Sequence, residues 1–336
     1  MTQTVQLSEF FKWKKVLVTG GAGFVGSHVV DKLVKFGAIV TVPVRKNTQL
    51  NNLKAVKKNI SIIEADLFDR KNVDPVLKGQ ELVIHLASAK LGGIAYSMRH
   101  HGSIFRDNML SCINVLDSAH CESVKRFVLV SSACVYPHNA NVPISEEEAF
   151  KDAPEPTNSG FGWSKLMQEY MALSFAKEYG MNIGIVRPFN MYGPRDNFFD
   201  ANNHVIPGII MRLFDGENPL KVWGTGEQTR SFLHISDGAH GILQMCAHTN
   251  VTGPLNLGSD EEISIKDLAK LIVELSGIKA EIIFDTSKPD GQPRRACDGT
   301  KAKEALQFQA AVPLRDGLRK TIEWYRKERA MREMIV

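Results

Sequence analysis

A short apolar strand followed by three regularly spaced glycines constrains this 336-residue chain more than any other feature. Residues 15–19 (KVLVT) have the composition of a buried strand, and Gly20, Gly23 and Gly26 follow it. Such a loop lets backbone N–H groups approach a pyrophosphate at the start of the next helix. Because a helical pattern covers residues 27–36, we predict a dinucleotide site that includes Phe24 and Val25. A plain glycine-rich turn is the alternative.

Apolar segments then alternate with helical patterns, and the further predicted strands cover residues 38–44, 60–65, 82–87, 126–131 and 181–187. This alternation predicts an α/β fold with a doubly wound parallel sheet of the Rossmann type. Beyond residue 188 glycine, proline and aromatic residues become frequent, which indicates a smaller C-terminal substrate lobe. We therefore predict a dinucleotide-binding domain over 13–187 plus 231–256, and a substrate lobe over 188–230 plus 257–330.

Composition narrows the class of protein. With 43% hydrophobic and 23% charged residues, a disordered chain is excluded. The net charge of +4 is not gathered into a basic stripe, so we expect no nucleic-acid partner. No apolar run approaches the ~20 residues of a membrane span, and no secretory signal is recognisable. The five cysteines form no CxxC pair, so we predict a cytoplasmic protein with free thiols and without a metal site.

The residues after the second predicted strand bear on the choice of dinucleotide. An acid at this point accepts the ribose 2′-OH of NAD, whereas an Arg accommodates the 2′-phosphate of NADP. This chain has Arg45 and Lys46 and no acid. NADP is therefore the predicted cofactor, and NAD is the alternative. Arg45 and Lys46 could also belong to a solvated basic loop that contacts no cofactor.

Two further motifs accompany the glycine loop: Ser131–Pro137 (SSACVYP), which contains Ser132, and Phe161–Lys165 (FGWSK). Together the three motifs resemble those of the extended short-chain dehydrogenase/reductases that act on nucleotide sugars. In that family a Ser after the fifth strand and a Tyr-x-x-x-Lys pair handle the proton that accompanies hydride transfer. The resemblance implies that Ser132 and Lys165 are catalytic and that Lys165 also contacts the cofactor. A Lys ammonium lowers the pKa of a neighbouring phenol, which makes this pairing chemically sensible.

Phe161 occupies the position of the family's catalytic Tyr. Phe keeps the shape of that side chain and removes the hydroxyl that transfers the proton. Two interpretations stay open: an introduced Tyr-to-Phe substitution in an otherwise intact site, or a natural loss of redox function. We favour the first, because the other motif residues are present.

The resemblance also implies further contacts. Lys and Arg side chains suit a diphosphate, so Arg212 and Arg230 with the stacking Trp223 are candidate substrate residues, each of which is otherwise an ordinary surface residue. Ser132 and Asn190 are also expected to contact the substrate. Asp290 is expected to accept a hydrogen bond from a ribose hydroxyl. The remaining predicted cofactor contacts are Asp66, Leu67, Leu86, Ala87, Pro188 and Asn190.

Several strings resemble the GDP-L-fucose synthase branch of the family: residues 91–94 (LGGI), 192–197 (YGPRDN), 204–208 (HVIPG), 222–226 (VWGTG) and 284–292 (FDTSKPDGQ). The string SACVYP also resembles GDP-mannose 3,5-epimerases. Both relatives invert carbons beside a C4 ketone, which requires a base and an acid. The resemblance assigns Cys134 and His204 to these roles; the alternatives are a packing cysteine and a loop histidine.

These motifs predict an NADP(H)-dependent epimerase/reductase of a nucleotide-linked 4-keto-6-deoxy sugar, GDP-linked as the first choice. Ala133 and Cys134 stand where a 4,6-dehydratase carries Asp-Glu, which disfavours dehydration. The alternatives are a nucleotide-sugar epimerase without net reduction and a non-catalytic protein that binds NADP or sugar nucleotides. The resemblance also implies a homodimer in which the helices flanking the Tyr-x-x-x-Lys segment pair across a two-fold axis. Met167, Tyr170, Met171 and Phe175 offer an apolar stripe at helical spacing for this contact; the alternative is that the stripe faces the chain's own sheet.

Overall fold

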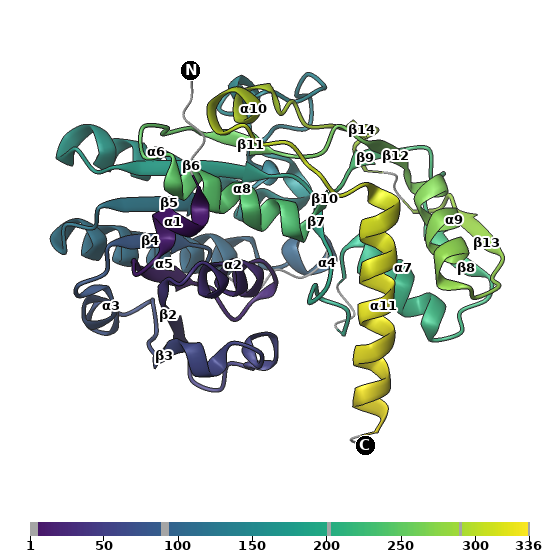
Figure 1. The fold of residues 1–336 in the computed structure, drawn as a ribbon. Coiled ribbons are helices and arrows are strands. Elements are labelled where there is room, and N and C mark those ends of the chain that lie inside the picture. Colours follow the sequence, from purple (N-terminus) through teal and green to yellow (C-terminus); the bar gives the residue numbers. More distant parts are fainter. Residues whose placement is uncertain (1–5, 89–93, 200–202, 289–290, 335–336) are drawn as a thin grey trace.

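A seven-stranded parallel sheet forms the centre of the computed structural model, which describes residues 6–88, 94–199, 203–288 and 291–334 (Figure 1). Its strand order is β11-β6-β5-β4-β1-β2-β3, and every neighbouring pair is parallel. The predicted doubly wound α/β fold is therefore confirmed. The strands are β1 (Lys15–Thr19), β2 (Ile39–Val44), β3 (Ile60–Glu64), β4 (Leu82–His85), β5 (Arg126–Val130), β6 (Ile183–Pro188) and β11 (Leu255–Leu257).

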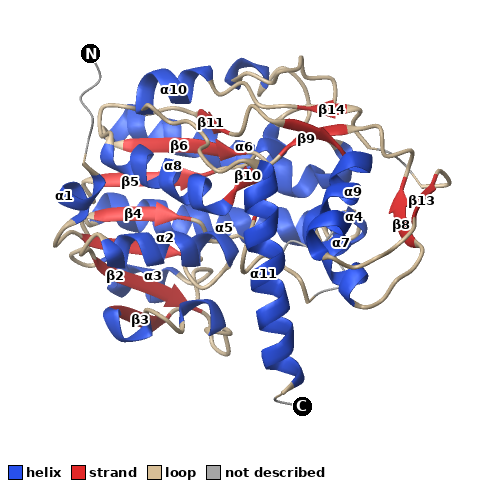
Figure 2. Cartoon of the chain, turned by 45° about the vertical axis from the view of Figure 1, so that its right-hand side comes forward, coloured by secondary structure: helices blue, strands red, loops and turns tan. Residues whose placement is uncertain are grey.

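Helices cover both faces of this sheet (Figures 1 and 2). On one face, α1 (Leu7–Phe11), α2 (Phe24–Lys35), α8 (Ile235–Ala247) and α10 (Thr300–Leu306) share a hydrophobic core with the strands. On the other, α3 (Arg70–Leu77), α5 (His101–Cys121) and α6 (Ser159–Tyr179) close a second core. Burial on both faces explains why the strands are apolar along their whole length.

A third core lies beside the carboxyl ends of the strands. It packs α7 (Val205–Phe214), α9 (Ile265–Ser276) and α11 (Leu314–Glu333) against the parallel pair of β8 (Leu220–Trp223) and β13 (Ile282–Asp285). A small sheet of β12 (Glu262–Ser264), β9 (Thr229–Ser231) and β14 (Arg294–Arg295) adjoins it, and β7 (Met191–Tyr192) pairs with β10 (Leu233–His234).

The predicted domain boundaries stay a prediction, but the packing adds detail to them. Leu7 and Phe11, which precede residue 13, are buried in the core of the large sheet. Leu306 and Phe308, which fall in the predicted range 257–330, pack in the same core. The chain thus returns to the large sheet after β14, and then leaves it again for α11.

A buried ion pair connects the end of β6 to α6. Arg187 donates through Nε and Nη2 to the carboxylate of Glu169, with the shortest contact at 2.6 Å, and both side chains are at most 2% exposed. Arg187 Nη1 also donates to the hydroxyl of Tyr136, and the same carboxylate accepts the hydroxyl hydrogen of Ser131. The pair therefore ties together α6, β6 and the segment that follows β5.

We predict that Arg187→Met destabilises the chain by about 3–5 kcal/mol, because it leaves the Glu169 carboxylate buried and unpaired. The matched control is Arg187→Met/Glu169→Met, in which both charges are removed and most of the stability returns. Guanidinium denaturation followed by circular dichroism measures both. Equal stability of the single and the double variant would contradict this account of the pair.

Candidate active site

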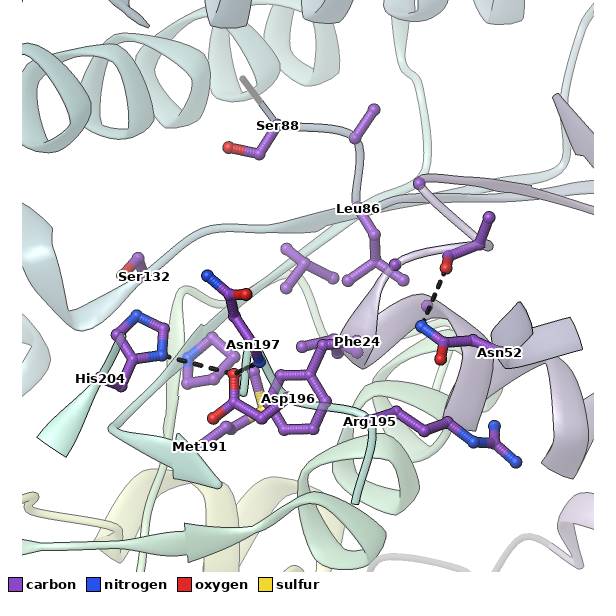
Figure 3. Close-up of a pocket in the computed structure, with 18 of the residues that line it drawn as sticks. Phe24, Asn52, Leu86, Ser88, Ser132, Met191, Arg195, Asp196, Asn197 and His204 are labelled. Carbon is purple, nitrogen blue, oxygen red and sulfur yellow. Dashed lines mark hydrogen bonds and ion pairs between the residues drawn. The ribbon is translucent and has the colours of Figure 1, made fainter. Parts of the chain in front are cut away.

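A cavity of about 1580 Å³ lies at the carboxyl ends of the parallel strands (Figure 3). Small-molecule sites commonly measure about 300–1,000 Å³, so this one has room for two ligands side by side. In open α/β sheets ligands bind at this edge of the sheet. In the view of Figure 3, Ser132 and His204 lie toward one side of the cavity, and Phe24 and Asn52 toward the other.

The glycine loop between β1 and α2 forms one wall. Gly20 has φ +69°, and a Cβ there would lie 2.8 Å from the carbonyl carbon of Leu86. A Cβ on Gly26 would lie 2.2 Å from the Gly20 carbonyl oxygen, so only glycine permits α2 to start this close to the strand. The hydroxyl of Thr19 accepts from the N–H groups of Leu86 and Ala87, which holds the two strand ends together. The N-terminus of α2 therefore faces the cavity, as an anion site requires.

Polar and basic side chains line the cavity beyond β2. Arg45 is among them, whereas Lys46 is not. Asn52 donates to the Ala22 carbonyl at 3.2 Å and so connects this segment to the glycine loop. Lys54, which the sequence analysis did not single out, also lines the cavity.

Ser132 and Cys134 enter the cavity from a short 3₁₀ helix, η3 (Ala133–Val135), directly after β5. The Ser132 hydroxyl accepts from the Cys134 N–H at 3.2 Å and thereby caps this helix. Gly162 of α6 sits against it, because a Cβ there would lie 2.6 Å from the Cys134 carbonyl oxygen. This glycine lets α6 bring Phe161 and Lys165 up to the same wall.

Phe161 and Lys165 lie one turn apart on α6, both buried. The Lys165 ammonium is 5.8 Å from the centre of the Phe161 ring, and it donates to the Val130 carbonyl at 3.0 Å. Burial lowers the pKa of Lys165 to about 8. The geometry of the Tyr-x-x-x-Lys pair is thus present, and the aromatic ring beside the ammonium carries no hydroxyl.

His204 stands at the N-terminus of α7 and contacts Asp196, with 3.5 Å between Nδ1 and Oδ1 (Figure 3). The Asp196 side chain is 3% exposed, whereas the imidazole is 61% exposed and lines the cavity. Hydrogen bonding to Asp196 raises the pKa of His204. The sequence analysis missed Asp196; its only signal was a place in the YGPRDN string.

Arg230 lies in β9 opposite Arg295 of β14. Burial, and then the charge of Arg295, lowers the pKa of Arg230 to about 10. Glu155 approaches Arg295 at 3.9 Å, so one carboxylate faces two guanidinium groups. Arg295 lines the cavity and Arg230 lies beside it. The Arg-Arg doublet at 294–295 was the signal that the sequence analysis did not use.

The structure brings most of the predicted site residues together. Asn190 lines the cavity and donates to the Ser231 carbonyl at 2.9 Å. Arg212 and Trp223 do not line it: Arg212 pairs with Glu217, and Trp223 is 58% exposed on the surface outside the cavity. Asp290 and most of the string 91–94 fall outside the described residues. The predicted residues that line the cavity are Gly20, Gly23, Phe24, Val25, Gly26, Arg45, Asp66, Leu67, Leu86, Ala87, Ser132, Cys134, Phe161, Lys165, Pro188, Asn190 and His204.

The fold and this site define an enzyme of the nucleotide-sugar epimerase and reductase class. Residues 16–258 match the NAD dependent epimerase/dehydratase family, and the chain belongs to that family. The resemblance to short-chain dehydrogenase/reductases that act on nucleotide sugars is thereby confirmed.

Individual relatives agree with this assignment. The probable GDP-L-fucose synthase 1 of Oryza sativa subsp. japonica is 33% identical over 94% of this chain and 92% of its own length. UDP-glucose 4-epimerase of Thermotoga maritima, solved with UDP-glucose, superposes with a TM-score of 0.83 at 30% identity and covers 93% and 99% of the two chains. A double mutant of the Streptomyces venezuelae dTDP-glucose 4,6-dehydratase, solved with NAD, has a TM-score of 0.81 at 25% identity and covers 94% and 98%.

Among the described residues, none of the helices is both long and apolar enough to cross a membrane. Nor do three or more His, Cys, Asp or Glu side chains gather there in an arrangement that could hold a metal ion.

Proposed function

We propose that this chain is an NADP(H)-dependent epimerase/reductase of a nucleotide-linked 4-keto-6-deoxy sugar, with GDP as the nucleotide. One observation carries the proposal. Cys134 and His204 are 70 positions apart in the chain, yet both line the cavity that the glycine loop also lines. The similarity to a probable GDP-L-fucose synthase supports the GDP-linked keto sugar as substrate.

The residues of the cavity suit chemistry at the carbons beside a C4 ketone. Such a carbon loses a proton to a base and regains one from an acid on the opposite face, which inverts it. We assign these roles to Cys134 and His204. The hydroxyl of Ser132 would donate to the ketone oxygen and stabilise the enolate that forms in between. Arg230 and Arg295 would bind the diphosphate, because among the described residues these two cations share a single acidic neighbour, Glu155.

Reduction at C4 needs a second set of groups. NADPH, when bound, supplies the hydride, and the glycine loop with Lys165 fits such a dinucleotide. The proton for O4 would come from a phenol at position 161, where this chain has Phe161. We therefore expect C3 and C5 epimerisation to proceed and C4 reduction to be impaired.

The alternative is an epimerase without net reduction, and Phe161 favours it specifically. Its ring is 7% exposed and packed near the Lys165 ammonium, so the position is filled by a well-packed residue. If the substrate arrives as a ketone, inversion beside the ketone requires no hydride. A non-catalytic protein that binds NADP or sugar nucleotides is a third candidate, which the assay below separates from the other two.

We predict that Phe161→Tyr raises the rate of NADPH oxidation with GDP-4-keto-6-deoxymannose by about 10²–10⁴-fold over the unsubstituted chain, because it restores a positioned acid for O4. Absorbance at 340 nm follows the reaction. The matched control is Phe161→Tyr/Lys165→Met, in which the phenol lacks its neighbouring ammonium and the gain is lost.

The outcomes separate the three candidates. NADPH oxidation by the Phe161→Tyr chain supports the epimerase/reductase. If this chain leaves NADPH untouched yet exchanges deuterium from solvent into the sugar, the epimerase without net reduction is the function. If neither occurs with this or other keto sugars, the chain is a binding protein.

Arg45 supports NADP over NAD. Its side chain lines the cavity just beyond β2, and the chain has no acid at this strand end that would accept a ribose 2′-OH. Lys54 adds a second cation to the same stretch of the wall.

We predict that Arg45→Ser weakens NADPH binding by about tenfold or more and leaves NADH binding nearly unchanged, since only NADPH carries the 2′-phosphate. Lys46→Ser is the control, because Lys46 adjoins Arg45 without lining the cavity. Fluorescence titration with each dinucleotide measures the affinities. An equal loss for NADPH and NADH would contradict the assignment.

A homodimer is part of the proposal, but its contact surface differs from the predicted stripe. Met171 and Phe175 pack against the core of the chain's own sheet, and Met167 packs against the smaller core cluster that includes residues of η3. The large apolar side chains that α5 and α6 expose are Phe105, Leu110, Ile113, Trp163, Tyr170, Leu173 and Tyr179. We expect these two helices to pair with those of a second copy.

Light scattering at micromolar concentration is therefore expected to give twice the chain mass of 37.4 kDa. Tyr170→Glu places a charge in the exposed face and shifts the mass toward that of the monomer. A monomer mass for the unsubstituted chain would rule the dimer out. The predicted cytoplasmic location stays a prediction.

A further inference from the structure

The two residues before Asp196 are anchored to α2. His28 of α2 donates to the Pro194 carbonyl at 2.9 Å, and Arg195 pairs with Asp31 of the same helix at 2.8 Å. Asp196 lies between these anchors and the N-terminus of α7. The backbone directly before Asp196 is thereby held against α2.

Asp196 has no partner of opposite charge other than His204 among the described residues. Its Oδ1 accepts from the N–H of Asn197 at 2.7 Å and faces His204 Nδ1 at 3.5 Å, and its Oδ2 is buried without a hydrogen-bond partner there. A buried carboxylate that is left short of partners is costly unless a cation lies beside it. The neighbouring cation, Arg195, is already paired with Asp31. The imidazole of His204 is the group that meets this requirement.

We propose that Asp196 is a positioning residue that keeps His204 in its imidazolium form, with Nδ1–H toward the carboxylate and Nε2–H available to the cavity. This inference rests on the proposed function, in which Cys134 and His204 move protons at carbon, and it adds Asp196 to that pair. The Cys134 thiolate takes the proton from carbon, the electron pair passes to the ketone oxygen, and Nε2–H delivers a proton to the opposite face. The thiol and the neutral imidazole that result then exchange a proton through solvent.

The charges around His204 are consistent with this assignment. The hydrogen bond to Asp196 raises the pKa of His204. Arg195 of the same loop is neutralised by Asp31 of α2, and Arg332 of α11 pairs with Glu328 at 3.3 Å. Lys165 of α6 and Arg295 of β14 also line the cavity, and neither contacts the imidazole among the described residues. Asp196 is thus the group that sets the charge of this histidine.

The first test reads the imidazole directly by NMR titration of the ring protons, with the signal assigned by its loss in His204→Gln. We expect the pKa of His204 to lie above the ordinary 6.5 and to fall in Asp196→Asn. Asp196→Glu should keep most of the elevation. Asp215→Asn is the matched control, because it removes a carboxylate at the other end of α7, where Asp215 pairs with Arg329, and leaves the anchors of the Asp196 loop in place.

The second test follows solvent deuterium uptake by GDP-4-keto-6-deoxymannose against pH. We expect the alkaline limb of the profile to move to lower pH in Asp196→Asn and to stay unchanged in Asp215→Asn, whereas a merely structural role would lower the rate at every pH alike. An unaltered pKa of His204 in Asp196→Asn overturns the inference, as does an unaltered profile. Absence of exchange by the unsubstituted chain overturns the proposed function, and the NMR titration still decides whether Asp196 controls His204.

Discussion

The buried ion pair between Arg187 and Glu169 is the contact on which the geometry of the site depends. Arg187 closes β6, Glu169 stands one turn after Lys165 on α6, and the shared carboxylate holds Ser131 at the end of β5. Ser132, Phe161 and Lys165 are therefore placed by one set of hydrogen bonds. Because the pair is almost fully buried, its strength depends on a dry interior, and a loss of either partner would leave the other uncompensated.

The large sheet and its glycine loop could be predicted from the sequence because they arise from local patterns. Strands buried on both faces are apolar throughout, and the close approach of α2 to β1 demands glycine at positions 20 and 26. By contrast, the predicted domain begins at residue 13 and leaves out α1, since the two buried side chains of this helix, Leu7 and Phe11, occupy only one face. A helix of five residues is too short for its hydrophobic periodicity to be recognised in the sequence.

The rest of the site could not be predicted because it depends on contacts between distant segments. Arg230 and Arg295 meet only because β9 and β14 pair, and Asp196 turns toward His204 only because its loop is anchored to α2. Motif reasoning found His204 and Arg230 but not the residues that adjust their charge. Conversely, Arg212 and Trp223 suit a diphosphate by residue type, yet neither lines the cavity.

Phe161 separates two kinds of chemistry that share this cavity. In the proposed function, proton transfer at carbon uses Cys134 and His204, neither of which contacts position 161 among the hydrogen bonds of the described residues. Hydride transfer to C4 requires a proton for O4, which a phenyl ring does not supply. On this account the chain retains the first activity and is impaired in the second.

The most direct test of this account is the incorporation of deuterium from D₂O at C3 and C5 of GDP-4-keto-6-deoxymannose by the chain with Phe161 in place, measured by NMR. We predict uptake at one or both carbons without net reduction when NADPH is present, and loss of uptake in Cys134→Ser. A keto sugar that binds, as shown by calorimetry, yet takes up no deuterium at either carbon would contradict the account.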